Sequence, residues 1–448
     1  MKQFKYYFFA TLAGIILQGC TKNDLAINNK EKGTFVNNNL SYYERVSLLD
    51  DYLIPENKAL NLLKSFQDSI STSLNSRSNP GNIVFNVIER YNIPLFLQPQ
   101  TRSKEHKRQS DNTLIYKIQM QHDNGCGYAL VAGDLRAANI IAYIPDTIGF
   151  LTDERSNFKR ELLNISINAN LNRIKKFENI KDSLRKSAKN KESEIATRSG
   201  IANNNELVEF YESVISYEKS TDYLPHSTTA WDQGVPYNCK LEQGCSNTPG
   251  GRYHTGCGVV AIAQAMAYYE PSLTIYGTTV NWKELKRNPI ITGSSSKVIK
   301  NQIGYLMKWI GERVGAEYTC KGTTTHSNDI CKVLNLVGMK CDKRIDWNWD
   351  AIYNSLKQRK LVHAEAQTSD GEGHAWIIDG FLIGNRSDTE KILYVHNNLG
   401  WSGDDDGYYE IEPQISFEAG GYSFDRKLGI NYIFRSMTTH FSSAVMRR

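Results

Sequence analysis

The spacing of apolar residues predicts helices and then strands in the first part of the chain. Between 40 and 77 the apolar residues recur at helical intervals, and Pro55 predicts a break between two helices. Short apolar runs at 114–120 and 127–134 are separated by Asp-Asn-Gly, which predicts a β-hairpin, and 140–144 predicts a third strand. This part is therefore predicted to form a small α+β domain.

The pattern changes in the middle of the chain. From 153 to about 185 it is charged and helical, whereas 186–205 loses periodicity and is rich in Lys, Ser, Asn and Glu. Such a stretch is typical of an exposed linker in which proteolytic cleavage is tolerated. Arg198 lies inside it, and a cut after Arg198 or a preceding lysine is one expectation, whereas self-cleavage would prefer a site behind a bulky apolar residue.

The second half of the chain runs from predicted helices to predicted strands. The helices are expected at 256–269, 295–314 and 328–337. The strands are expected at 362–367, 374–381, 391–397, 407–411 and 431–437. The second half is therefore predicted to consist of an α-rich lobe followed by a β-rich lobe.

Composition and charge indicate two globular units that interact with each other. The length of 448 residues favours two domains plus a targeting segment, and 40% hydrophobic residues with 25 tyrosines indicate a packed core. The first 198 residues hold 28 Lys+Arg against 20 Asp+Glu, a net charge of +8, and the remainder holds 25 against 28, a net charge of −3. This asymmetry favours an intramolecular partner over nucleic acid.

The N-terminus has the pattern of a signal peptide. Lys2 and Lys5 precede an apolar stretch at 6–17, which is too short to cross a bilayer as a stable helix. The following Leu-Gln-Gly-Cys resembles a bacterial lipobox, in which Cys20 becomes the lipidated first residue. An ordinary secretion signal with a chance cysteine is the alternative.

The remaining cysteines predict disulfides rather than a metal site, since an exported chain permits them. Cys239 and Cys245 flank a short loop and form the best pair by proximity, while Cys320 could pair with Cys331 or Cys341. None of the spacings is a zinc pattern, so neither a metal nor another cofactor is expected.

Three segments carry candidate chemistry. Cys257 opens an apolar, small-residue run to Tyr269, His374 precedes a predicted strand, and Asn398 follows the next one. A thiol peptidase needs such a set: the thiolate is the nucleophile, and a helix N-terminus with a neighbouring imidazolium lowers its pKa. The histidine then exchanges the proton, and the asparagine oxygen orients the ring. Taken singly, each residue also fits a structural role: a buried cysteine, a strand-end histidine bonded to water, a turn asparagine.

Two further residues complete the candidate site. Gln233 lies 24 residues before Cys257, and its side-chain N–H can form an oxyanion hole with the backbone N–H of Cys257. A surface turn built on Gly234 and Pro236 is the structural alternative. Trp401 would place an aromatic ring beside the histidine and asparagine and shield them from water.

These segments resemble the streptopain family of papain-like cysteine peptidases. The matching stretches are 231–238, 255–269, 373–380 and 396–403, together with the hairpin 127–134 and the strand 141–143, which look like the family's inhibitory propeptide. The resemblance implies Cys257 as nucleophile, His374 as general base and acid, and Gln233 as oxyanion donor. It further implies Asn398 as orienter and Trp401 as aromatic shield. One departure is Leu399, where the family often has tryptophan.

The combined expectation is an α+β protein with a papain-like two-lobed catalytic domain behind a small α+β propeptide. We expect a signal peptide at 1–19, a propeptide with linker at 20–198 and the peptidase domain at 199–448. The expected function is a secreted or lipid-anchored zymogenic cysteine endopeptidase, exported to the outer membrane on its periplasmic or surface face, with release after processing as a second outcome. Its partners would be protein or peptide substrates with bulky apolar residues before the scissile bond, its own propeptide in cis and, through the lipid, the membrane. The alternatives are an inactive binding lipoprotein on the same fold and a transglutaminase-like acyltransferase, which amine incorporation would reveal.

Overall fold

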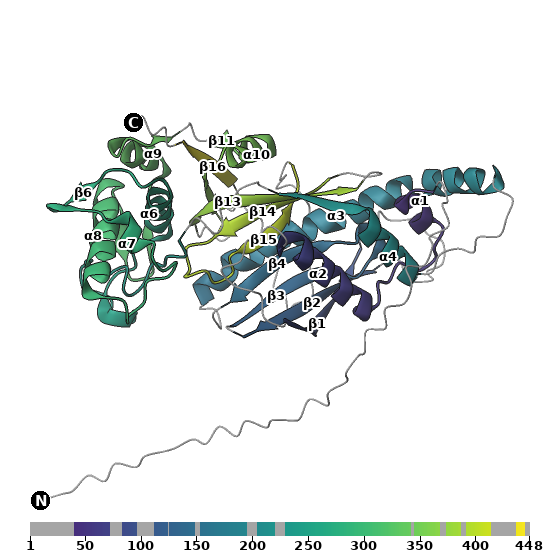
Figure 1. Cartoon of the computed structure of the whole chain (residues 1–448), viewed down its shortest axis with the longest axis horizontal. Coiled ribbons are helices and arrows are strands. Elements are labelled where there is room, and N and C mark those ends of the chain that lie inside the picture. Colours follow the sequence, from purple (N-terminus) through teal and green to yellow (C-terminus); the bar gives the residue numbers. More distant parts are fainter. Residues whose placement is uncertain are drawn as a thin grey trace, which may run out of the picture. The chain divides into compact units, whose positions relative to one another are not determined.

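The structure is a computed structural model of the whole chain (Figure 1). It describes residues 40–71, 83–95, 112–123, 125–147, 153–194, 204–219, 229–341, 345–367, 373–386, 391–413 and 436–443. Cys20, the signal peptide and Arg198 lie outside the described residues, so the predictions made for them stay predictions.

The front half, residues 40–194, contains the helices and strands predicted for it and one more strand. Helices α1 (Tyr42–Ser47) and α2 (Glu56–Ser71) end and begin on either side of Pro55, as expected. Strands β2 (Asn112–His122) and β3 (Gly125–Ala132) form the predicted hairpin. The front half is completed by β1 (Val84–Pro94), which the apolar pattern did not predict, and by β4 (Ile140–Thr147).

The predicted linker is wrong over its first part. Helix α3 runs from Asp153 to Glu194, through residues that were expected to be exposed and irregular. Ala188 is fully buried there, and Lys191 lies 2.7 Å from the carboxylate of Glu44 on α1. Packing against α1 therefore stabilises a helix that its own sequence pattern does not predict.

The back half, residues 204–443, begins with helices and ends with strands, as predicted. Its helices are α4 (Asn204–Val214), α6 (Cys257–Tyr269), α7 (Trp282–Leu285), α8 (Lys297–Arg313), α9 (Ser327–Leu336) and α10 (Trp349–Lys357). Its longer strands are β5 (Ile215–Lys219), β12 (Val362–Gln367), β13 (Gly373–Arg386), β14 (Ile392–Asn398), β15 (Gly407–Ile411) and β16 (Ser436–Ser443). Short strands are β6 (Thr274–Ile275), β7 (Thr278–Thr279), β8 (Glu317–Thr319), β9 (Gly322–Thr324), β10 (Lys340–Cys341) and β11 (Ile345–Asp346). The expected α+β class is confirmed, whereas α10, β5 and α4 were not predicted.

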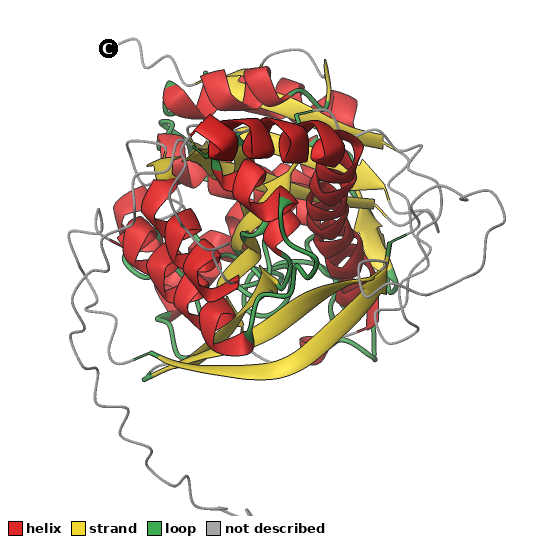
Figure 2. Cartoon of the chain, turned by 90° about the vertical axis from the view of Figure 1, so that its right-hand side faces the viewer, coloured by secondary structure: helices red, strands yellow, loops and turns green. Residues whose placement is uncertain are grey.

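Both halves share one antiparallel sheet, drawn as adjoining arrows in Figures 1 and 2. The strand order is β1-β2-β3-β4-β15-β14-β13-β12-β16-β10, and β5 pairs with β13. The junction is the pairing of β4 with β15, where Tyr143 lies opposite Tyr408 and Ala142 opposite Tyr409. The front half is thus joined to the back half by backbone hydrogen bonds as well as by side chains.

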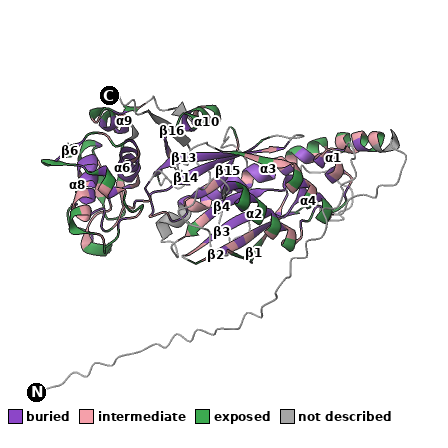
Figure 3. Cartoon of the chain, viewed as in Figure 1, coloured by how far each residue is buried: buried purple, intermediate pink, exposed green. Residues whose placement is uncertain are grey.

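Burial is greatest in strands β3, β4, β13, β14 and β15, whereas the outer strand β1 is largely exposed (Figure 3). The residues of β4 divide between two apolar clusters, because a strand has two faces. Ile141 belongs to a cluster that includes residues of α3 and α6, whereas Ile140 belongs to one that includes residues of α1, α2 and α4. The first of these clusters also contains the segments that carry the candidate site.

The disulfides differ from the expected pairing. Cys245 is bonded to Cys320, and Cys331 to Cys341, so the expected Cys239–Cys245 pair is wrong, and so is the suggested pairing of Cys320 with Cys331 or Cys341. Cys239 is a free thiol whose sulfur lies 3.2 Å from the carbonyl oxygen of Lys300 on α8. Over the described residues, no helix combines the length and apolar character that a bilayer span requires.

Candidate active site

Cys257 is the first residue of α6. The preceding Gly256 has φ +92°, a conformation that a side chain would strain, and this turn brings the chain into the helix. The backbone N–H of Ala375 donates to the Cys257 sulfur at 3.3 Å. The nucleophile predicted from the sequence therefore lies at a helix N-terminus and directly beside the residue that follows His374.

The pKa of Cys257 differs from the expected one. Burial raises the pKa of this thiol, and the N–H groups of Ala375 and Gly258 oppose the rise without cancelling it. The sequence led us to expect a lowered pKa, because a helix N-terminus and an imidazolium favour the thiolate. In this structure the loss of hydration outweighs the helix N-terminus, so the thiol form is favoured.

His374 is the second residue of β13, and its ring lies next to the rings of two tryptophans. Its Nε2 lies 3.0 Å from the carbonyl oxygen of Leu399. Its ring centroid lies 4.8 Å from that of Trp401 and 6.0 Å from that of Trp376, with which it is stacked. The predicted base and the predicted aromatic shield are thus in contact.

Asn398 ends β14 and is buried. Its Nδ2 donates to the carbonyl oxygen of Thr229 at 2.8 Å, and its Oδ1 accepts from Nε2 of Gln264 at 3.0 Å and from the N–H of Gly400 at 3.4 Å. These partners place the predicted orienter between α6 and the segment that carries Gln233.

The turn after Asn398 is fixed by a buried carboxyl group. The backbone N–H of Leu399 donates to Asp406 at 2.7 Å, and burial raises the pKa of Asp406 to about 8. The Leu399 side chain is fully buried in the core, where the family often has tryptophan. Its carbonyl can therefore face His374 while its side chain fills the interior.

Gln233 is half-buried and joined to the nucleophile loop by its backbone. Its carbonyl oxygen accepts the N–H of Thr255 at 2.9 Å, two residues before Cys257. The adjacent Asp232 accepts the N–H of Gly234 at 3.0 Å and the hydroxyl of Ser402 at 3.0 Å. The predicted oxyanion donor is thus carried by a segment tied to both the cysteine and the asparagine loops.

Phe158 of α3 is a residue of this site that the sequence did not reveal. Its ring centroid lies 4.5 Å from that of His374, 5.1 Å from Trp376 and 6.0 Å from Trp401. The side chain is buried to 4% exposure. The available signal was an aromatic residue at the start of a charged helix, but nothing in the pattern indicated which residues it would contact.

Charged side chains join the front half to the strands and turns next to the site. Lys159 forms an ion pair with Asp405, and Arg173 lies 2.5 Å from the carboxylate of Glu410. Thr147 donates to Asp404 at 2.7 Å. The basic front half and acidic back half predicted from composition therefore meet through specific pairs.

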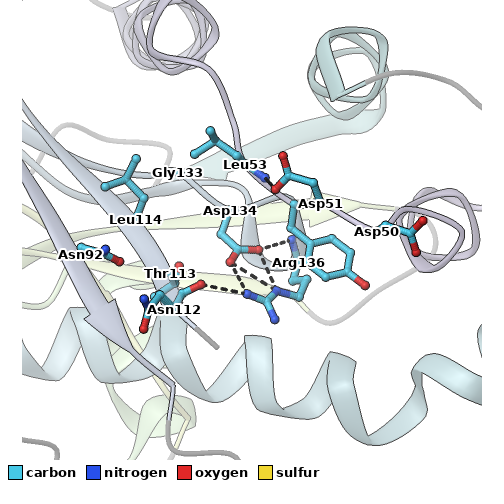
Figure 4. A pocket seen from close by; sticks show the side chains of 11 residues that line it. Asp50, Asp51, Leu53, Asn92, Asn112, Thr113, Leu114, Gly133, Asp134 and Arg136 are labelled. Atoms are coloured by element: carbon cyan, nitrogen blue, oxygen red, sulfur yellow. Dashed lines mark hydrogen bonds and ion pairs between the residues drawn. The ribbon is translucent and has the colours of Figure 1, made fainter. Parts of the chain in front are cut away.

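A separate cavity of about 190 Å³ lies in the front half (Figure 4). Asp134 and Arg136 form an ion pair of 2.6 Å at its wall, and Arg136 also contacts Glu178 at 2.9 Å. The guanidinium is therefore occupied by carboxylates of the protein. None of the predicted site residues lines this cavity.

Residues 231–409 match the model of the Peptidase C10 family. This segment contains Cys257, His374 and Asn398, so the resemblance to the streptopain family is confirmed and the chain is a cysteine-type peptidase. No curated protein matches the sequence.

Two solved structures resemble the chain. A mutant fragment of prointerpain A from Prevotella intermedia is 18% identical, with a TM-score of 0.43, over 74% of this chain and 96% of that one. Active wild-type interpain A from Prevotella intermedia, a cysteine protease, is 22% identical, with a TM-score of 0.34, over 47% of this chain and 91% of that one.

Proposed function

We propose that the chain is a zymogenic cysteine endopeptidase in which Cys257 and His374 form the catalytic dyad. The observation that carries the proposal is the position of the Cys257 sulfur, 3.3 Å from the N–H of Ala375, which places it next to His374 at the start of α6. A buried structural cysteine would need neither the positive-φ glycine before it nor the histidine beside it.

In the proposed reaction, His374 takes the thiol proton and the Cys257 thiolate attacks the carbonyl carbon of the scissile bond. Gln233 and the Cys257 N–H stabilise the oxyanion, and His374 returns the proton to the leaving amine. Water then hydrolyses the thioester with His374 as base. Asn398 orients the imidazole through both steps, and Trp401 shields it from bulk water.

Latency would follow from the contact between Phe158 and His374. The ring of Phe158 occupies space against the imidazole, and α3 is secured by the Lys159–Asp405 and Arg173–Glu410 pairs. Burial also favours the protonated thiol of Cys257. In the full-length chain the front half would thus cover the base, while burial of Cys257 opposes formation of the nucleophile.

The proposal includes export and lipid anchoring at Cys20, which rests on the lipobox-like sequence. Replacement of Cys20 by alanine should abolish incorporation of radiolabelled palmitate and shift the protein out of the membrane fraction. Labelling that persists in Cys20→Ala would contradict the anchor without affecting the proposed chemistry.

Substitution of the nucleophile tests the chemistry. Cys257→Ala should abolish peptide hydrolysis and leave the circular dichroism spectrum unchanged, because no nearby group can replace the thiolate. Cys239→Ala is the matched control, since Cys239 is also a free, half-buried thiol and should retain activity. His374→Ala should be equally damaging, and Asn398→Ala less so because it removes only orientation. Hydrolysis by purified Cys257→Ala at the wild-type rate would refute the mechanism.

Self-processing tests the zymogen. Wild-type protein should accumulate a product that begins between 187 and 207, whereas Cys257→Ala should stay intact. Because helix α3 continues to Glu194, we expect the cut after that residue and before α4. N-terminal sequencing of the product identifies the site, and full activity of an uncut chain would show that the front half is not inhibitory.

A further inference from the structure

Gln264 is a buried polar residue in the otherwise apolar helix α6. It lies seven residues, about two turns, after Cys257, and its side chain has 0% exposure. An amide at such a position must find hydrogen-bond partners, since an unpaired buried polar group is costly. Its hydrogen-bond partners therefore indicate its role.

Both ends of the Gln264 amide are bonded to segments of the active site. Its Oε1 accepts the backbone N–H of Trp231 at 3.0 Å, two residues before Gln233. Its Nε2 donates to Oδ1 of Asn398 at 3.0 Å. One side chain therefore joins the nucleophile helix, the segment of the oxyanion donor and the predicted orienter.

The direction of each bond follows from backbone groups whose roles are fixed. The N–H of Trp231 can only donate, so Oε1 of Gln264 must face it and Nε2 must face Asn398. The N–H of Gly400 and the carbonyl of Thr229 independently require the same orientation of the Asn398 amide. The two amides are thus locked in one arrangement.

We propose that Gln264 is a positioning residue of the peptidase, acting through Asn398 and the segment of Gln233. It holds the oxygen of the Asn398 amide on one side and the nitrogen on the other, and so fixes the start of the turn whose Leu399 carbonyl lies 3.0 Å from Nε2 of His374. This inference rests on the proposed function, since it concerns the same dyad.

The side-chain chemistry explains why glutamine is needed. Methionine has a similar length but supplies neither bond. Ionised glutamate has the same shape and still accepts from Trp231, but its second oxygen repels Oδ1 of Asn398. Protonated glutamic acid restores a donor at that position, so it mimics glutamine.

The test compares Gln264→Met and Gln264→Glu with wild type after activation, using peptide hydrolysis. We expect both substitutions to lower kcat about 10- to 100-fold near pH 7 while KM changes less than about twofold. Ile262→Val is the matched control on the same helix, since Ile262 is also buried and makes no polar contact. It should lower the melting temperature with little loss of kcat.

The pH profile separates positioning from a loss of folding. Activity of Gln264→Glu, expressed relative to wild type at each pH, should rise as the pH falls and the new carboxyl is protonated. Cys257, Asp232, His374, Asp379 and Asp406 are ionisable groups on the segments that form the site, and wild type measured at each pH is the reference for their titration. Gln264→Met should show no such recovery.

A double-mutant cycle completes the test. In the Asn398→Ala background, Gln264→Met should lower kcat by a clearly smaller factor than in wild type, because Asn398, one of the two groups through which it acts, is gone. Full additivity, or a pH-independent ratio for Gln264→Glu, would overturn the proposal. If Gln264→Met does not fold, the test rests on the pH dependence of the activity of Gln264→Glu relative to wild type. If these results contradict the role of Gln264, Cys257→Ala should still be inactive. The proposed function is therefore tested separately from the role of Gln264.

Discussion

Replacement of Phe158 by alanine should partly release the latent enzyme. Phe158 is 4% exposed and its ring contacts three aromatic rings of the site, so its contribution is made almost entirely in the docked form. Truncation of a buried phenylalanine to alanine typically costs about 3–5 kcal/mol. At 1.4 kcal/mol per tenfold, the docking of the first turns of α3 should weaken about 10²- to 4 × 10³-fold.

The remaining contacts limit how far the chain opens. Lys159 and Arg173 still pair with Asp405 and Glu410, and the β4–β15 pairing is untouched. We therefore expect a front half that stays bound but exposes the dyad more often. The lag before self-processing should shorten, and full-length protein should hydrolyse a small peptide before any cut appears.

The assay is pulsed alkylation of full-length protein with iodoacetamide, read by peptide mass spectrometry. Labelling of Cys257 should accelerate in Phe158→Ala, while labelling of the free thiols Cys126 and Cys239 in the same sample serves as the internal reference. Phe177→Ala is the matched variant, because Phe177 lies on the same helix and is buried to 1% exposure but contacts Tyr52 instead of His374.

The two phenylalanine variants should separate stability from access to the site. Both should lower the melting temperature, and Phe158→Ala should open the site more. If Cys257 labelling and the processing lag are unchanged in Phe158→Ala, or change equally in Phe177→Ala, the contact with His374 is not inhibitory.

Three further outcomes are expected. Gln233→Ala should reduce kcat about 10²-fold or more, and a change in KM alone would remove its role as oxyanion donor. Burial raises the pKa of Glu410 to about 7, although the charge of Arg173 lowers it. A carboxyl group whose pKa is raised in the folded protein stabilises the folded, docked form fully below its ordinary pKa of 4.5. This stabilisation is lost as the pH rises toward 7. The melting temperature of alkylated full-length protein should therefore fall as the pH rises over this range, and it should fall less in Glu410→Gln. An equal pH dependence of the melting temperature in the two proteins would contradict the raised pKa of Glu410. Cys320→Ser opens the bond to Cys245, which spans 75 residues, and should lower the free energy of unfolding by about 2–4 kcal/mol in urea titrations; no change would show that the bond is dispensable.

Local patterns predicted the elements that depend on neighbouring residues. Pro55 separated α1 from α2, and the Asp-Asn-Gly turn located the β2–β3 hairpin. The order of cysteine, histidine and asparagine motifs identified the family, because each motif needs only its own short segment. These features are encoded within a few residues of one another.

Features that depend on distant residues were not predicted. The end of α3 is stabilised by α1, whose Glu44 lies 147 residues before Lys191, and the partner of Cys245 lies 75 residues away. Phe158 and Gln264 carry no local signal of what they contact, since an aromatic or an amide in a helix has many structural uses. The β4–β15 pairing likewise depends on two strands that lie far apart in the chain.

If the front half is removed as proposed, the β4–β15 junction has a consequence for the remaining enzyme. Loss of β4 turns β15 from an inner strand into an outer one and leaves hydrogen-bonding groups of Tyr408 and Tyr409 without their former partners. Such an edge invites pairing with strands of other molecules, and charged side chains are the usual protection against it. Glu410 and Asp405, freed from Arg173 and Lys159, would then place negative charge along that edge. The same carboxylates that hold the front half in place would keep the processed enzyme from aggregating.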